Sequence, residues 1–406
     1  MTVPTQDPSD IRDAPTEDFI ARSRRLFPVE AELDRMLTRK MRKRAQPRNP
    51  AAYSLDALVG CLERFLEDHG GPGQRIGNPR WMAGGASKIQ VAFTLDRPAD
   101  GGGTEQLDLV MRMEPAESIN TTSRLREVQL LDFFQDKLPV PKVRWLDDDA
   151  RWFPEPAIIY DRASGVTRPT DQENRVSGIG QRFSTKLRQE LAPQFMDALA
   201  RIHTADPAAV GLEAFHRPEL GTTESALLQL NRVRRVWHED HHFSFPLFDA
   251  AGNWLERNLP VLDHATILHG DFRAGNFLFD EGSRRITAWL DWERGHIGDR
   301  HRDLAWTTTS SFGNLAEDGK TFLVSGLIPL DEFYHEYERR TGLPVDPARL
   351  RYYRIFNCYQ IITTALCSAW RIVHLGKTHQ DVLIAWVEGV GYSQAQELRR
   401  LLLEEL

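Results

Sequence analysis

The stretch that decides the fold is residues 267–306, which read ILHGDFRAGNFLFDEGSRRITAWLDWERGHIGDRHRDLAW. It contains the triplet HGD at 269–271, and Asn276 follows five residues after the aspartate. Two apolar runs come next, separated by a polar turn, and the second run ends in LDWE at 290–293. This pattern predicts a loop followed by a β-hairpin that brings a second aspartate back toward the first.

The residues in this loop and hairpin suit phosphoryl transfer. That reaction needs a carboxylate to take the proton of the acceptor hydroxyl, and oxygen ligands to hold Mg²⁺ against the phosphates of ATP. Asp271 fits the first role as catalytic base, and Asn276 with Asp291 fits the second. Glu293 is a further candidate metal ligand. Protein kinases have the same Asp-to-Asn spacing in their catalytic loop, with an arginine where this chain has Gly270.

Each of these residues also has a plainer explanation, because a single carboxylate in a loop or after a strand is often only a cap or a surface group. The combined pattern carries the prediction, not any single residue. His269 is expected to organise the loop and not to transfer a proton.

The combined pattern resembles the aminoglycoside phosphotransferase and choline kinase-like superfamily, and within it the kinase domains of acyl-CoA dehydrogenase-like proteins (families 10 and 11). That subgroup characteristically reads HGDYRxxN, AxLDWE and GDPxxDLA, where this chain has HGDFRAGN, AWLDWE and GDRHRDLAW. The resemblance covers roughly residues 54–400. It implies an α+β, protein-kinase-like two-lobed fold, with a small antiparallel-sheet lobe and a larger, mainly helical lobe. It also implies that Asp303 braces the catalytic loop, and it leaves the local turn in question because Arg300 replaces the expected proline.

The small lobe is expected to hold the nucleotide. The runs KIQVAFTL and EQLDLVMRM alternate apolar and polar residues around a glycine-rich turn, which predicts a hairpin. Arg112, on the second strand, is expected to bind the ATP phosphates, and Val110 on the same face to cover the adenine. Glu127 lies on the apolar stripe of the next helix, where a buried carboxylate needs a partner, and Arg112 is the natural one.

Two further segments of this lobe are expected to contact the nucleotide. Gly84–Ser87 precedes the first strand of the hairpin and would cover the phosphates through backbone N–H groups, with Gly85 and Ser87 as the contact residues. The apolar run 156–161 predicts a strand that leads into the hinge, where backbone groups near Asp161 would contact adenine.

The chain is expected to divide into three parts. Residues 1–50 form an N-terminal extension, an acidic tail followed by a basic amphipathic helix; residues 51–162 form the nucleotide-binding lobe; and residues 163–406 form the helical lobe with the catalytic loop and the acceptor site. Residues 22–48 hold ten Arg or Lys. A solvated helix face is the favoured explanation of this charge, and contact with an anionic partner or a subunit interface is the alternative.

The composition excludes several other classes of protein. The 406 residues include 51 Lys+Arg against 58 Asp+Glu, a net charge of −7, so nucleic acid is not an expected partner. No apolar run approaches the roughly 18 residues of a membrane span, and the polar N-terminus is no secretory signal. Three cysteines are too few for a disulfide framework, so a cytoplasmic enzyme is expected, either monomer or homodimer.

The acceptor is expected to be a small-molecule alcohol. Residues 351–380 contain four Arg or Lys and no Asp or Glu. If this segment lines the acceptor site, it favours an apolar or anionic acceptor, such as a hydroxyacyl compound, over a polycationic aminoglycoside; otherwise it is simply a core helix.

Three other functions compete with the small-molecule kinase. A protein kinase is disfavoured because no A-P-E segment follows Asp291 and no full glycine-rich loop is present. An inactive nucleotide-binding scaffold would have no use for the base at Asp271. The third alternative is an anionic-surface or nucleic-acid binder acting through residues 22–48.

Overall fold

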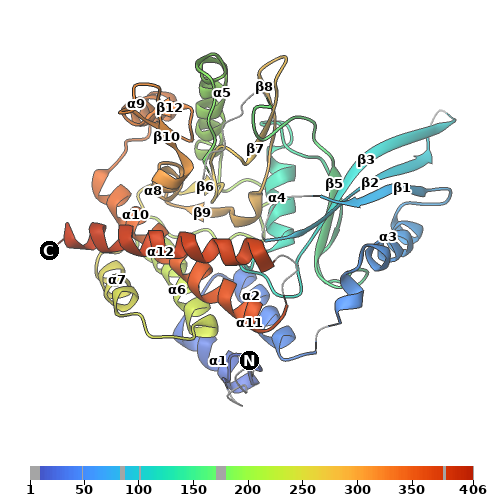
Figure 1. The fold of residues 1–406 in the computed structure, drawn as a ribbon, viewed down its shortest axis with the longest axis horizontal. Coiled ribbons are helices and arrows are strands. Elements are labelled where there is room, and N and C mark those ends of the chain that lie inside the picture. The colour runs from blue at the N-terminus through green and yellow to red at the C-terminus, as the bar shows by residue number, and fades with distance from the viewer. Residues whose placement is uncertain are drawn as a thin grey trace.

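The protein has two lobes joined beside a helical N-terminal extension (Figure 1). The computed structural model describes residues 10–47, 49–82, 87–99, 102–170, 180–377 and 381–405. The lobes are an antiparallel sheet with few helices and a larger, mainly helical part. The expected α+β class and two-lobed arrangement are therefore confirmed.

The small lobe is a five-stranded antiparallel sheet with strand order β1-β2-β3-β5-β4. Its strands are β1 (Arg75–Trp81), β2 (Ile89–Pro98), β3 (Thr104–Met113), β4 (Val143–Asp147) and β5 (Ala157–Asp161). The predicted hairpin is β2–β3, paired without a break from Ile89 opposite Met113 to Pro98 opposite Thr104. The sequence did not predict β1, whose residues are mostly exposed and show no apolar alternation, nor β4.

The two faces of this sheet have different partners. Helix α3 (Leu55–His69) covers one face, where its Leu62 and Phe65 are buried with Val91 of β2 and Met111 of β3. Helix α4 (Arg124–Phe134) lies on the opposite face, where Arg112 contacts it. Period-two alternation along β3 thus separates a hydrophobic face from a face that holds charge.

The helical lobe is built around one large hydrophobic core. Its helices are α5 (Thr185–His203), α6 (Glu224–Asp240), α7 (Pro246–Arg257), α8 (His301–Thr307), α9 (Leu330–Thr341), α10 (Pro347–Ile362), α11 (Ala369–His374) and α12 (Asp381–Leu403). Its short strands are β6 (Thr266–Leu268), β7 (Phe277–Asp280), β8 (Arg285–Trp289), β9 (His296–Gly298), β10 (Asn314–Leu315), β11 (Phe322–Val324) and β12 (Ile328–Pro329). The predicted hairpin after the catalytic loop is β7–β8.

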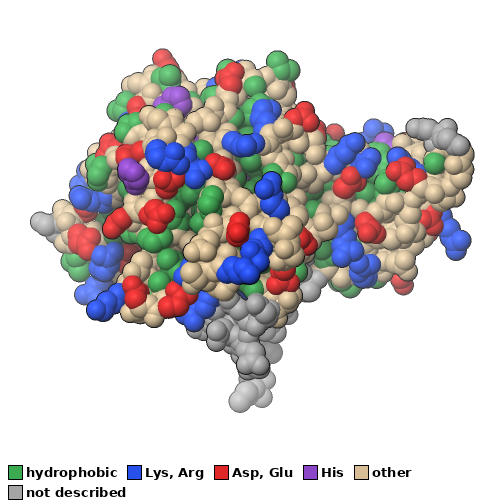
Figure 2. Space-filling view, turned by 90° about the horizontal axis from the view of Figure 1, so that it is seen from above, with side chains coloured by type: hydrophobic (Ala, Val, Ile, Leu, Met, Phe, Trp, Pro, Cys, Tyr) green, Lys and Arg blue, Asp and Glu red, His purple; other side chains and the backbone are tan. Residues whose placement is uncertain are grey.

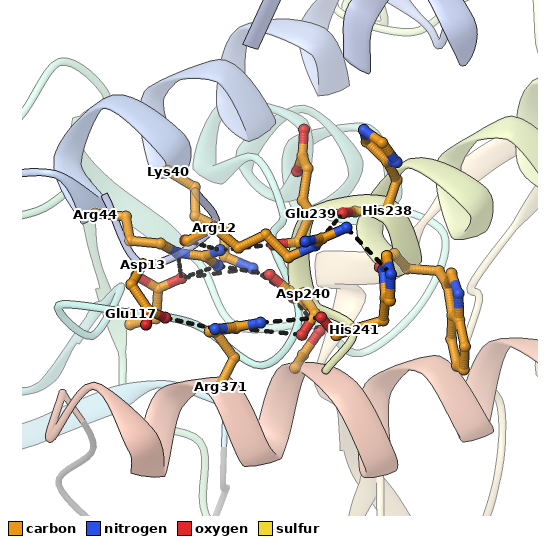
Figure 3. A network of polar contacts seen from close by, with 12 residues as sticks. Arg12, Asp13, Lys40, Arg44, Glu117, His238, Glu239, Asp240, His241 and Arg371 are labelled. Carbon is orange, nitrogen blue, oxygen red and sulfur yellow. Dashed lines mark hydrogen bonds and ion pairs between the residues drawn. The ribbon is translucent and has the colours of Figure 1, made fainter. Parts of the chain in front are cut away.

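The N-terminal extension contains two helices, α1 (Glu17–Leu26) and α2 (Ala31–Arg44). Its basic residues divide: Arg24 and Arg42 are exposed, as a solvated face requires, whereas others make buried contacts. Arg44 is only 3% exposed, and its guanidinium reaches Glu117 and Asp240, each at 2.6 Å. Lys40 lies beside the same two carboxylates (Figure 3). The described part of the acidic tail binds back through Asp10 and Asp13 to Arg371. Residues 1–9 lie outside the described part.

The surface carries charges of both signs (Figure 2), and the described cysteines are unpaired. Lys and Arg side chains are interspersed with Asp and Glu over both lobes on the face drawn in Figure 2. Within the described ranges, no helix has the length and apolarity needed to cross a membrane. Cys61, Cys358 and Cys367 are buried free thiols.

Candidate active site

Asp271 and Asn276 converge in the loop between β6 and β7. Asn276 Nδ2 donates to Asp271 Oδ2 at 2.7 Å and to the backbone oxygen of the same residue at 2.8 Å. The other carboxylate oxygen of Asp271 accepts from Trp306 Nε1 at 2.6 Å and from Arg273 Nε at 3.0 Å. Three donors therefore fix the orientation of this carboxylate.

Asp303 and His269 hold the loop in place. Asp303, on α8, accepts the backbone N–H of His269 at 2.8 Å and of Gly270 at 2.9 Å. Burial alone would raise the pKa of Asp303, but His203 and the neighbouring histidines lower it to about 2. His269 Nε2 donates to the backbone oxygen of Leu290 at 3.1 Å, tying the loop to the end of β8. Burial lowers the pKa of His269 and keeps it neutral, which suits the organising role.

Gly270 explains why the loop differs from the protein-kinase sequence. Its φ is +80°, and a Cβ built there would lie 2.4 Å from the backbone oxygen of Arg294. An arginine cannot occupy this position without moving the backbone.

The turn after β9 keeps its shape without proline. Arg300 has φ of −52°, within the range that proline would impose, and its side chain binds Asp263 at 3.0 Å and the backbone oxygen of Pro344 at 2.8 Å. These contacts hold the local turn although Arg300 replaces the expected proline.

Asp291 lies at the end of the β7–β8 hairpin in a left-handed conformation, with φ 65° and ψ 46°. Such a conformation costs an ordinary residue roughly 1–2 kcal/mol, less for aspartate, and is often found at functional sites. Its carboxylate contacts Arg112 across the gap between the lobes and remains 30% exposed.

Arg112 lies at the centre of a buried ion-pair cluster between the lobes. The expected pair with Glu127 is present at 3.4 Å, and Arg112 also binds Glu293 at 2.7 Å. Glu293 additionally accepts from Lys88, Arg124 and Asn120. Burial opposes the charge on Glu293, but Lys88 and the two arginines lower its pKa. These contacts engage both oxygens, so Glu293 belongs to this cluster, and its role as a metal ligand stays a prediction.

Lys88 and Arg124 are cluster members that sequence reasoning missed. Lys88 is 1% exposed and lies 3.2 Å from both Glu114 and Glu293. The alternation of β2 carried the signal, because residues 88, 90 and 92 share the face of Arg112. Arg124, at the start of α4, lies within 3.4 Å of Glu114 and Glu293 and contacts Glu127; nothing in the sequence distinguishes it from a surface arginine.

The structure places the other residues expected to contact the nucleotide in different surroundings. Val110 is buried with Ile158 and Tyr160 on the Arg112 face, and partly buried Met82, Val128 and Leu146 pack against them. The Asp161 N–H donates to the Lys142 oxygen, and its carboxylate binds Arg144 at 2.6 Å. The contact of adenine with backbone groups near Asp161 stays a prediction. Gly85 lies outside the described residues, and Ser87 is half-buried just before β2.

A cavity of about 170 Å³ opens beside Asp271. Its walls come from the catalytic loop and α8, from α10 with the π-helical turn Thr363–Ser368, and from α12. Its charged lining residues are Asp271, Arg273 and Arg294, and much of the rest is apolar, including Phe312, Ile361, Ala365, Trp386, Val387 and Val390. The segment 351–380 therefore lines the cavity next to the catalytic loop as well as packing in the core.

Known proteins are similar to this chain in sequence. Acyl-CoA dehydrogenase family member 10 of Mus musculus is 23% identical over 265 residues, 62% of this chain and 23% of its own length. Family member 11 of Rattus norvegicus is 32% identical over 162 residues, 37% of this chain and 20% of its own length. The chain spans no more than about a third of these dehydrogenase relatives.

Antibiotic phosphotransferases are also similar. Aminoglycoside 3'-phosphotransferase of Streptomyces fradiae is 25% identical over 213 residues, half of this chain and 71% of its own length. APH(4)-Ia, solved with ADP and hygromycin B, gives a TM-score of 0.52 at 15% identity, covering 82% of this chain and 97% of that one. The GDP and kanamycin complex of APH(2")-IIia gives 0.51 at 16%, covering 84% and 98%. At these identities, the two solved structures establish the fold.

The profile of the Phosphotransferase enzyme family matches residues 93–353, a span that holds Arg112, the catalytic loop, the β7–β8 hairpin and α8. Because this match covers more than half of the chain, the protein belongs to the Phosphotransferase enzyme family.

Proposed function

We propose that this chain transfers the γ-phosphoryl group of ATP to a hydroxyl of a small molecule, with Asp271 as the catalytic base. The observation that carries the proposal is the position of Asp271, held by three donors at the edge of a largely apolar cavity. A hydroxyl bound there could transfer its proton to the carboxylate as the oxygen attacks the phosphorus. Trp306 and Arg273 would stabilise the orientation of the base.

Asn276 and Asp291 fit a magnesium ion. The Asn276 amide nitrogen is engaged with Asp271, so its oxygen is the atom offered to a cation, and Asp291 is only partly buried. Amide and carboxylate oxygens are the ligands that Mg²⁺ prefers, and the ion keeps several waters when few protein ligands are present. When bound, it would neutralise charge on the phosphates.

The small lobe supplies the remaining nucleotide contacts in this proposal. We assign nucleotide binding to residues 51–162 and acceptor binding to residues 163–406. Arg112 would hold phosphate oxygens, anchored by Glu127 and Glu293, and Val110 would lie beneath the adenine. Gly85 and Ser87 remain the proposed phosphate cover. The ADP and GDP in the two solved relatives support a purine nucleotide as the donor.

The acceptor is proposed to be apolar or anionic, such as a hydroxyacyl compound. The cavity's apolar walls and its two arginines oppose a polycationic aminoglycoside. The similarity to acyl-CoA dehydrogenase family members supports the same acceptor class.

The test is to substitute the base and measure chemistry and nucleotide binding separately. Asp271→Asn should lower ADP release with an alcohol panel by about 10²–10⁴-fold, because the amide cannot accept the proton. Mg-ATP affinity, measured by calorimetry, should change little. Asp331→Asn, an exposed aspartate at the start of α9, is the matched control.

Two outcomes would oppose the proposal. An Asp271→Asn variant as active as the wild type would exclude the base. Tight ATP binding with no acceptor-dependent ADP release across the panel would favour an inactive scaffold.

A further inference from the structure

Arg294, at the edge of the candidate active site, makes no direct ion pair with a described residue. It ends the short turn Trp292–Arg294 after Asp291 and lines the cavity that also holds Asp271. Its guanidinium stacks over Trp306, 4.3 Å from the ring centroid, and Trp306 in turn donates to Asp271. Its Nε is buried and has no hydrogen-bond partner, and the guanidinium forms no ion pair with any described residue.

Two more buried arginines behind this wall also lack a carboxylate partner among the described residues. Arg302 binds neutral groups, Gln360 at 2.6 Å, His296 at 2.8 Å and Gln229 at 3.0 Å. Arg232 donates to the backbone oxygen of Thr121 at 3.2 Å. Burial, reinforced by their like-charged neighbours, lowers the pKa of Arg302 to about 9 and that of Arg232 to about 10.

These three, the partly buried Arg294 and the buried Arg302 and Arg232, differ from the other buried arginines of the described residues. Each of the latter contacts at least one carboxylate: Arg44, Arg112, Arg124, Arg126, Arg235, Arg300 and Arg371. A buried charge is costly unless it is paired, and proteins retain unpaired charge chiefly where a ligand completes it. Arg294 therefore makes no direct contact with a carboxylate on the side that opens to the cavity, although Asp271, Glu293, Asp291 and Asp303 lie near enough for their charges to favour its cation.

We propose that Arg294 binds an oxyanion of the acceptor, a carboxylate or a phosphate, and so selects an acceptor with an anionic group and an apolar chain. This inference rests on the proposed function, since it assigns the cavity to the acceptor. The apolar walls would contact the apolar chain of the acceptor. Because Trp306 contacts both Arg294 and Asp271, the anion and the reacting hydroxyl would bind at two points of one cavity. Arg302, which holds Gln360 in the cavity wall, would add to the positive potential.

The test is a binding measurement that needs no catalysis. Calorimetry on the full chain at pH 7 compares octanoate and octyl phosphate with octanamide, a neutral molecule of the same chain length. We expect at least one anion to bind about tenfold or more tightly than octanamide, the range of a charge-assisted hydrogen bond. Preference for octanoate identifies a carboxylate, and preference for octyl phosphate identifies a phosphate.

Substitutions locate that preference. Arg294→Gln should reduce it to less than about threefold, Arg294→Lys should retain most of it, and Arg339→Gln, at an exposed arginine of α9, should not change it. No preference in the wild type, or an undiminished preference in Arg294→Gln, would overturn the assignment. If Arg294 only held Trp306 in place, Arg294→Gln would weaken the binding of octanamide and of the anions equally.

The two proposals fail separately. If Arg294 binds anions but the protein phosphorylates no alcohol, the oxyanion site is supported and the kinase assignment is contradicted. If the protein phosphorylates anionic and neutral alcohols with equal kcat/KM, the kinase assignment is supported and the oxyanion site is contradicted.

Discussion

At the scale of single residues, the site is fixed by side chains and backbone atoms that do no chemistry themselves. Gly270 passes so close to Arg294 that no side chain fits between them, and Asp303 takes both N–H groups at the start of the catalytic loop. Asp271 depends on both for its position.

Gly270→Ala should unfold the loop. The positive φ costs a non-glycine residue roughly 1–2 kcal/mol, and the contact with the Arg294 oxygen adds to that cost. Urea denaturation should show this loss of stability together with a loss of ADP release. Gly389→Ala is the control, because a Cβ there meets nothing within 4 Å in α12, and alanine should stabilise the helix by roughly 0.5–1 kcal/mol.

Asp303 should make stability depend on pH. Its pKa is lowered from 3.8 to about 2, so the unfolded chain binds the proton more readily than the folded one. The resulting stabilisation, about 2 kcal/mol, is complete above the unfolded pKa and is lost as pH falls from about 4 to 2. Asp303→Asn should be destabilised at pH 7, and its gap to the wild type should narrow over that window. A gap independent of pH would contradict the assigned cause.

At the scale of elements, the cavity beside Asp271 depends on how α10 continues. The π-helical turn Thr363–Ser368 places Thr364 in the cavity wall, where α12 packs along α10 (Figure 1). Such turns often mark functional sites. Apolar periodicity predicts the helices of this lobe, but a π turn has no comparable sequence signal.

Filling this cavity should separate acceptor binding from nucleotide binding. Val390→Phe adds bulk to the α12 wall, so the KM of an accepted alcohol should rise about tenfold or more, while the KM of ATP stays within about twofold. Steady-state kinetics with each substrate varied in turn measures both. Val210→Phe, at an exposed position, should change neither. A rise confined to ATP would place the nucleotide, and not the acceptor, in this cavity.

At the scale of the whole molecule, the N-terminal extension connects the two lobes. Arg44 binds Glu117, between β3 and α4, and Asp240, at the end of α6 (Figure 3). Burial opposes the charge on Asp240, but Lys40 and Arg44 lower its pKa, so the carboxylate stays ionised. The extension therefore helps to fix the position of the small lobe relative to the helical lobe.

Arg44→Met should destabilise the protein by about 3–5 kcal/mol, because it leaves two buried carboxylates with less positive charge. Arg42→Met, two residues earlier, removes an exposed pair with Glu17 and should cost far less, because water and salt screen an exposed ion pair. Denaturant unfolding compares the two directly. Equal costs would show that the buried pairs do not hold the lobes together.

The sequence by itself determined the two-lobed α+β fold, the catalytic loop with its hairpin, and the pairing of Arg112 with Glu127. The loop, the hairpin and the pairing follow from local spacing and alternation along the chain, and the two-lobed fold follows from the resemblance of its motifs to a known family. Only the tertiary structure decided that Lys88 and Arg124 join the cluster, that Arg44 is buried between the lobes, and that Arg294 faces the cavity unpaired. Burial and charge balance at those positions depend on residues distant in the sequence, such as Glu293 for Lys88 and Arg124 and Asp240 for Arg44, which no local pattern records.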